Sequence, residues 1–85
     1  MNIYEKVLKI KGAECQKKKA LEEMAELQVA MLHNSDGKAT DLDVVNEIAD
    51  VINTMEEMKL IYDKDHMCEQ IRMKKLMRLA KSLKV

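Results

Sequence analysis

Two short acidic segments with helical spacing place the strongest constraint on how this chain can fold. Residues 22–26 read Glu-Glu-Met-Ala-Glu, and residues 47–50 read Glu-Ile-Ala-Asp. Side chains three or four positions apart share one face of a helix, so each segment sets carboxylates side by side. The turn-forming sequence Asn-Ser-Asp-Gly at 34–37 lies between them. It predicts that two helices fold back on each other and bring the carboxylates together.

The second acidic segment lies in the most apolar helical stretch of the chain, residues 44–52. On a helical projection Glu47 borders the stripe formed by Val44, Val51 and Met55, and Asp50 follows the same edge. A carboxylate beside a buried seam is partly desolvated. An ionised group in such a place needs a partner charge or a bound cation.

The composition predicts a small helical domain that assembles with copies of itself. Eighty-five residues make one domain, residues 1–85, with a limited core. Apolar residues make up 47% of the chain and include eight Met, with no Phe, Trp or Pro. Narrow helix–helix seams suit this mixture, and we expect the Met-rich stripes in the core. The predicted fold class is all-α: an antiparallel helical bundle of about four helices, completed by oligomerisation to a homodimer or homotetramer.

Local signals predict where the four helices begin and end. The first helix is short, the second runs from about residue 13 to 33, the third from about 41 to 62, and the last occupies the C-terminal part. The residues expected to cap or end them are Asn2 with Glu5, Gly12, Thr40 or Asp41, and Asp63 or Asp65.

Charge is balanced over the whole chain but unevenly distributed along it. Residues 20–58 carry a net charge of −9, and residues 64–85 carry +5. The basic residues Lys74, Lys75 and Arg78 of the last helix have two readings. They form a solvated face favoured by the helix dipole, or they contact phosphates or the acidic block of another subunit.

The remaining features predict a cytoplasmic protein without a membrane or nucleic acid partner. Cys15 and Cys68 have no Cys-x-x-Cys spacing and are expected to be reduced thiols. No signal peptide and no apolar run of membrane-spanning length is evident. His33 and His66 are expected at the surface, not as metal ligands.

Four carboxylates from two facing helices, Glu23, Glu26, Glu47 and Asp50, are hard oxygen ligands of the kind that Mg²⁺ and Mn²⁺ prefer. The Glu-x-x-His spacing of carboxylate di-iron bundles is missing on the third helix. The competing interpretation is a solvated helix face, in which the acids of residues 22–26 pair with Lys18 and Lys19. The apolar setting of the second segment favours the metal site.

The chain resembles the MazG-like all-alpha nucleoside triphosphate pyrophosphohydrolases. The resemblance rests on Gly12, Gln16, the run Lys19-Ala-Leu-Glu-Glu-Met-Ala-Glu-Leu27, and Glu47-Ile-Ala-Asp-Val51. The family signature is EExxE followed after one to three dozen residues by ExxD, and here twenty residues, 27–46, intervene. The resemblance covers most of the chain.

The resemblance implies a Mg²⁺-dependent cleavage of a nucleoside triphosphate to the monophosphate and pyrophosphate. It makes Glu23, Glu26, Glu47 and Asp50 metal ligands, and Glu22 a further ligand or the base that orients water. The substrate-binding residues that it implies are Gln16 near the base or sugar, Asn53 near the substrate or a metal-bound water, and Lys19, Lys74, Lys75 and Arg78 at the phosphates. The first helix lacks the aromatic residues often expected for stacking a base, and Tyr4 is the candidate there.

Two further functions fit the same residues. One is a dUTP-type or phosphoribosyl-ATP-type pyrophosphohydrolase on the same scaffold. The other is a non-catalytic helical interaction or regulatory protein with solvated acids. Hydrolysis at phosphorus needs charge neutralisation and an activated water, which carboxylate-held metals supply without a nucleophilic side chain. The leading interpretation is therefore a house-cleaning hydrolase of NTPs or dNTPs.

Overall fold

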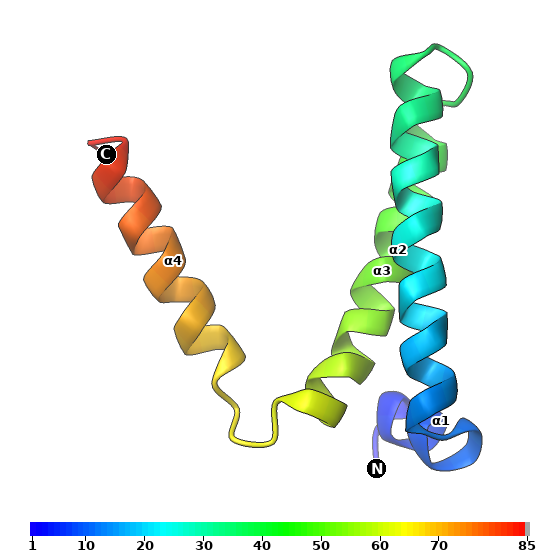
Figure 1. The fold of residues 1–85 in the computed structure, drawn as a ribbon, viewed down its shortest axis with the longest axis vertical. Coiled ribbons are helices and arrows are strands. Elements are labelled where there is room, and N and C mark those ends of the chain that lie inside the picture. The colour runs from blue at the N-terminus through cyan, green and yellow to red at the C-terminus, as the bar shows by residue number, and fades with distance from the viewer. Residues whose placement is uncertain (85) are drawn as a thin grey trace.

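The chain is all-helical, as predicted. A computed structural model describes residues 1–84, which contain four helices and no strand (Figure 1). The helices are α1 (Ile3–Lys11), α2 (Ala13–Ser35), α3 (Asp41–Tyr62) and α4 (Cys68–Ser82). Within this range every helix is too short or too polar to traverse a lipid bilayer.

Capping interactions fix the starts of α1 and α3 at the residues that the sequence predicted. At the start of α1 the Glu5 backbone N–H donates to Asn2 Oδ1 at 2.8 Å, and the Asn2 backbone N–H donates to Glu5 Oε1 at 3.3 Å. Thr40 and Asp43 form the same reciprocal pair at the start of α3. Each pair satisfies N–H groups that a helix leaves free, so these helix starts are locally encoded. Gly12, at φ +89°, ends α1 and joins it to α2 in a conformation that L side chains rarely adopt.

The long helices α2 and α3 lie side by side, and the chain reverses direction in the loop between them (Figure 1). The Asn34 side-chain amide holds this loop by donating to the Ala39 carbonyl and to Asp41 Oδ1, both at 3.0 Å. Gly37 adopts φ +73° in the same turn. The predicted turn at 34–37 therefore positions α3 beside α2, and α2 extends to Ser35, two residues beyond its predicted end.

Helix α1 packs against both α2 and α3 at the end of this pair that is far from the loop (Figure 1). The Tyr4 hydroxyl donates to Asn53 Oδ1 at 2.9 Å and ties α1 to α3. A second tie joins α2 to α3, where the Gln16 side-chain amide donates to Glu57 Oε1 in a buried setting. These two hydrogen bonds therefore join all three helices at this end of the molecule.

Helix α4 forms a separate arm that diverges from the α2–α3 pair (Figure 1). The Asp63 carboxylate accepts from the backbone N–H groups of Met67 at 2.7 Å and Cys68 at 2.9 Å. It satisfies N–H groups at the start of α4, but the N-cap position is Met67 and neither of the predicted caps, Asp63 and Asp65. These bonds lower the pKa of Asp63. Lys59 Nζ and Glu69 Oε1 lie 3.9 Å apart and form an ion pair between α3 and α4.

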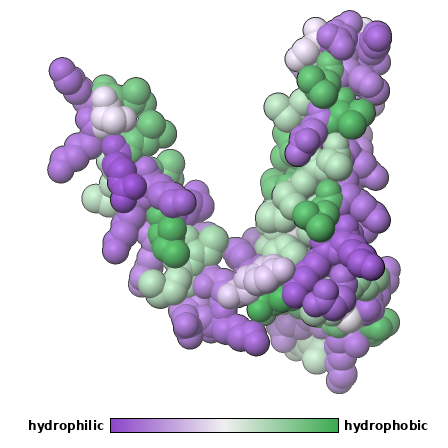
Figure 2. Space-filling model, in the orientation of Figure 1, coloured by the Kyte–Doolittle hydropathy of each residue, from purple (hydrophilic) through white to green (hydrophobic). Residues whose placement is uncertain are grey.

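Burial within one chain is slight. In residues 1–84, Ala20 is the single hydrophobic residue that is fully buried, because two paired helices enclose only a narrow seam. Apolar surface is visible both on the α2–α3 pair and on α4 (Figure 2). Met31 is 54% exposed and Met73 is 49% exposed, so in the single chain these two residues do not form the core expected of the Met-rich stripes.

Replacing Gln16 by Ala is expected to destabilise the fold by about 1–3 kcal/mol, because the buried Glu57 carboxylate loses its hydrogen-bond donor. The double variant Gln16→Ala with Glu57→Leu is expected to recover most of that loss, since neither polar partner then remains. Urea unfolding of the four species of this cycle measures the coupling. Strictly additive effects would contradict a hydrogen bond between these two side chains.

Candidate metal centre

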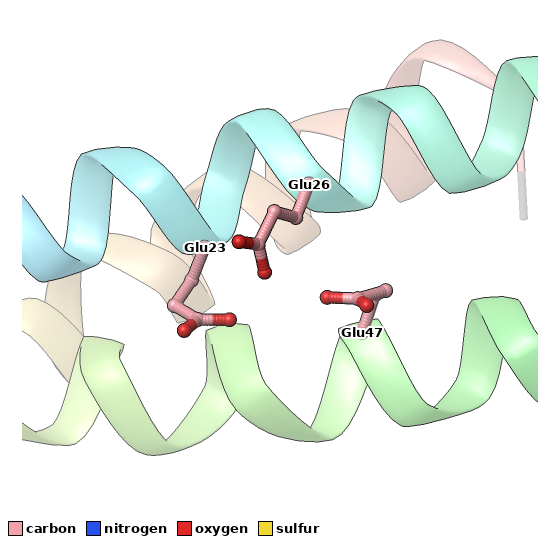
Figure 3. Close-up of side chains that lie close together, drawn as sticks. All are labelled: Glu23, Glu26 and Glu47. Atoms are coloured by element: carbon pink, nitrogen blue, oxygen red, sulfur yellow. The ribbon is translucent and has the colours of Figure 1, made fainter.

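Three of the predicted acids converge between α2 and α3. Glu23 and Glu26 from α2 and Glu47 from α3 point toward one another (Figure 3), and one oxygen of each lies within 4.8 Å of the others. The i,i+3 spacing sets the two α2 carboxylates on one face, and the reversal of the chain brings α3 opposite. The local pattern and the turn thus account for the cluster.

The cluster holds carboxylate oxygens that lack a partner. Glu23 is 6% exposed, and its Oε1 atom pairs with Lys19 Nζ at 2.9 Å. Its Oε2 atom and Glu47 Oε2 are buried and receive no hydrogen bond from any residue in the described part of the chain. Buried acceptors without a donor are costly, so these two atoms could accept a hydrogen bond or bind a cation.

The pKa shifts in the cluster show that its carboxylates repel one another. The negative charge of Glu23 raises the pKa of Glu26, with further contributions from desolvation and from the charge of Glu47. The hydrogen bond to Glu23 raises the pKa of Lys19, which is the nearby cation. Three carboxylates share one lysine, so the cluster carries excess negative charge.

The pH dependence of stability follows from the raised pKa of Glu26. Its protonated form is favoured in the fold, so this contribution to stability is complete below the unfolded-state pKa and is lost as the pH rises through the folded-state pKa. In EDTA, we expect the free energy of unfolding of the wild type to fall relative to Glu26→Gln as the pH rises from about 4.5 to 7. Urea titrations of both proteins across this range measure the difference. Parallel curves would show that Glu26 feels no repulsion in the folded chain.

The donor set fits a hard divalent cation. Within residues 1–84 the group consists of carboxylates alone, with no His or Cys that would favour zinc. Mg²⁺ typically takes a few carboxylate ligands and fills its other positions with water or phosphate oxygens. Glu23, Glu26 and Glu47 are the residues that could hold it.

Of the other predicted site residues, Lys19 pairs with Glu23, and the rest lie outside this cluster. Glu22 and Asp50 are exposed, and Asp50 is one helical turn beyond Glu47 on α3. Gln16 and Asn53 are near the α1 end, where they bond to Glu57 and Tyr4. Lys74, Lys75 and Arg78 are exposed on the separate arm α4.

Sequence reasoning missed several features around the centre. The buried polar residues Thr54 and Glu57 extend the seam toward α1, and no local pattern distinguished them from surface residues. A groove beside the cluster is lined in part by His33 and Asn46. The available signal was position: His33 lies two turns after Glu26 on the same helix face, and Asn46 directly precedes Glu47.

Comparison of the chain with family models, curated proteins and solved structures finds no match. The resemblance to the MazG-like enzymes therefore depends on the acidic motifs and their spacing.

Proposed function

We propose that this chain is a Mg²⁺-dependent nucleoside triphosphate pyrophosphohydrolase of the MazG-like kind. The observation that carries the proposal is the pair of buried oxygens without partners, Glu23 Oε2 and Glu47 Oε2, beside Glu26. A buried carboxylate oxygen without a donor is costly, and a divalent cation would give both oxygens a partner. The same three acids belong to the EExxE and ExxD motifs.

In this proposal Glu23, Glu26 and Glu47 hold Mg²⁺, with Mn²⁺ as a substitute, and Asp50 is the fourth ligand. The metal neutralises charge on the phosphate oxygens and lowers the pKa of its bound water. Glu22, exposed beside Glu23, is a further ligand or accepts the proton of the attacking water. The products are the nucleoside monophosphate and pyrophosphate.

Lys19 has a second role in this scheme. Its ammonium group lies on Glu23 in the single chain and offsets part of the cluster's charge. With a metal ion held by the three carboxylates, the Lys19 ammonium would be free to contact a triphosphate oxygen. In this proposal Lys19 therefore pairs with Glu23 when no metal is bound and with a substrate phosphate when one is.

We propose that two or four copies complete an antiparallel bundle. The α3 residues Val45, Ile48 and Ile52 form an exposed stripe at helical spacing, and α4 carries exposed apolar residues of its own. Lys74, Lys75 and Arg78 form no ion pair in the described part of the chain. They lie on a face of α4 different from Leu76 and Leu83, so they are available to substrate phosphates or to the acids of a neighbouring copy.

The test is pyrophosphate release measured across NTPs, dNTPs and phosphoribosyl-ATP, with Mg²⁺, Mn²⁺ or EDTA. We expect release that requires the metal and yields one monophosphate for each pyrophosphate. Preference for dUTP or phosphoribosyl-ATP would identify the alternative enzyme on the same scaffold. No release from any of them, with no effect of Mg²⁺ on the melting temperature, would favour a non-catalytic interaction protein.

A further inference from the structure

An open groove adjoins the acidic cluster on the side toward the α2–α3 loop. Its volume is about 490 Å³, and Glu26 and Glu47 form part of its wall. From these acids it extends along later residues of α2, including His33, and earlier residues of α3, including Asn46. Its volume lies in the range of small-molecule sites. Glu26 and Glu47 belong both to the groove and to the acidic cluster.

The lining of the groove combines a small apolar floor with polar groups that have no partner. Ala25, Val29 and Ala30 supply apolar surface with little bulk, which leaves space between the helices. The His33 imidazole and the Asn46 side-chain amide form no hydrogen bond with any residue in the range 1–84. An apolar groove with a few free polar groups is the usual character of a ligand site.

On the opposite side of the cluster, toward α1, two hydrogen bonds already join the polar side chains in pairs. Tyr4 and Asn53 bond to each other, and Gln16 bonds to the buried Glu57. A ligand that replaced the Tyr4 hydroxyl on Asn53 or the Gln16 amide on Glu57 would lose one of these bonds, which costs free energy. The groove toward the loop adjoins Glu26 and Glu47 and needs no such exchange, so we place there the part of a substrate that lies beyond its phosphates.

We infer that the nucleoside part of the substrate lies in this groove, where Asn46 and His33 determine selectivity for base and sugar. The inference rests on the proposed function, which places the triphosphate at the neighbouring carboxylates. The Asn46 amide offers one donor and one acceptor group to a base edge or a sugar hydroxyl. The His33 ring offers a face for stacking and a polar edge.

The direct test is nuclear magnetic resonance of isotope-labelled protein in Mg²⁺, titrated with α,β-imido triphosphates of the four deoxynucleosides and with inorganic triphosphate. Both probes should shift signals of the acidic cluster. The nucleotide probes alone should shift the Asn46 side-chain amide and the His33 ring. Titration reports binding without turnover, so the result does not depend on catalytic activity.

Variants sharpen the same experiment. Asn46→Ala and His33→Ala are each expected to weaken binding of the preferred imido nucleotide by about tenfold, the upper range for one hydrogen bond. Binding of inorganic triphosphate should be unchanged in both. Gln28→Ala, at an exposed position of the same helix outside this groove, is the matched control and should behave as the wild type.

Two results would overturn the inference in distinguishable ways. Nucleotide-specific shifts at Tyr4 and Gln16, with none at His33 and Asn46, would move the nucleoside to the α1 end and leave the hydrolase proposal intact. Absence of binding by every nucleotide and by inorganic triphosphate would remove the proposed function and this inference together.

Discussion

Replacing Glu47 by Gln is expected to reduce Mg²⁺-dependent pyrophosphate release by at least about a hundredfold. Glu47 is the α3 member of the cluster, and one of its oxygens is buried without a partner. An amide retains the shape of the carboxylate but loses the negative charge that a divalent cation needs. Changes in the groups that merely orient metal ligands cost about 10–100-fold, so loss of a ligand should cost no less.

The same substitution should leave the fold intact or stabilise it. Removing one negative charge relieves repulsion of Glu26, whose pKa is raised in part by Glu47. In EDTA the melting temperature of Glu47→Gln should therefore equal or exceed that of the wild type. In Mg²⁺ the wild type should gain stability and the variant should gain little.

Glu56→Gln is the matched control for this experiment, because it makes the same chemical change on the same helix. Glu56 pairs with Lys59 at 3.2 Å, away from the cluster. Its loss is expected to leave both activity and the Mg²⁺ response unchanged, since exposed ion pairs contribute little. Full activity of Glu47→Gln would remove Glu47 from the metal centre.

What could be predicted from the sequence was the local part of the structure. The capping pairs at Asn2 and Thr40 and the turn after Asn34 are encoded by neighbours in sequence, and they determine where helices begin and how α2 meets α3. The convergence of Glu23 and Glu47 follows from these local rules, because the helices they fix return alongside each other.

Other parts of the site depend on tertiary detail that periodicity does not contain. The partners of Gln16 and Asn53 are set by how α1 and α3 align with α2, and neighbours in sequence carry no signal of that alignment. The placement of α4 depends on the linker at 63–67 and on surfaces that one chain does not cover. Hydrophobic periodicity identified stripes suited to burial, but it does not specify which molecule buries them.

Disrupting the exposed apolar stripe on α3, formed by Val45, Ile48 and Ile52, is expected to weaken association between copies of the chain. If copies of this chain pack through it, the melting temperature should rise with protein concentration, because association stabilises the folded state by mass action. Ile52 is 56% exposed in the single chain and lies in the middle of this stripe. Replacing it by Asp would remove about 1.5–3 kcal/mol of apolar burial and place a charge in the interface, so association should weaken by at least about tenfold.

Light scattering coupled to size-exclusion chromatography measures this change for Ile52→Asp beside Lys18→Asp, which alters an exposed α2 residue that is not apolar. The Ile52 variant should shift toward the monomer and melt at lower temperature, while the Lys18 variant should keep the wild-type mass. In a chain that functions alone, both would be surface changes of roughly 0.5 kcal/mol or less. Equal masses and melting temperatures for all three proteins would therefore exclude this stripe as the contact between copies, because buried isoleucine cannot be exchanged for aspartate without a measurable loss of affinity.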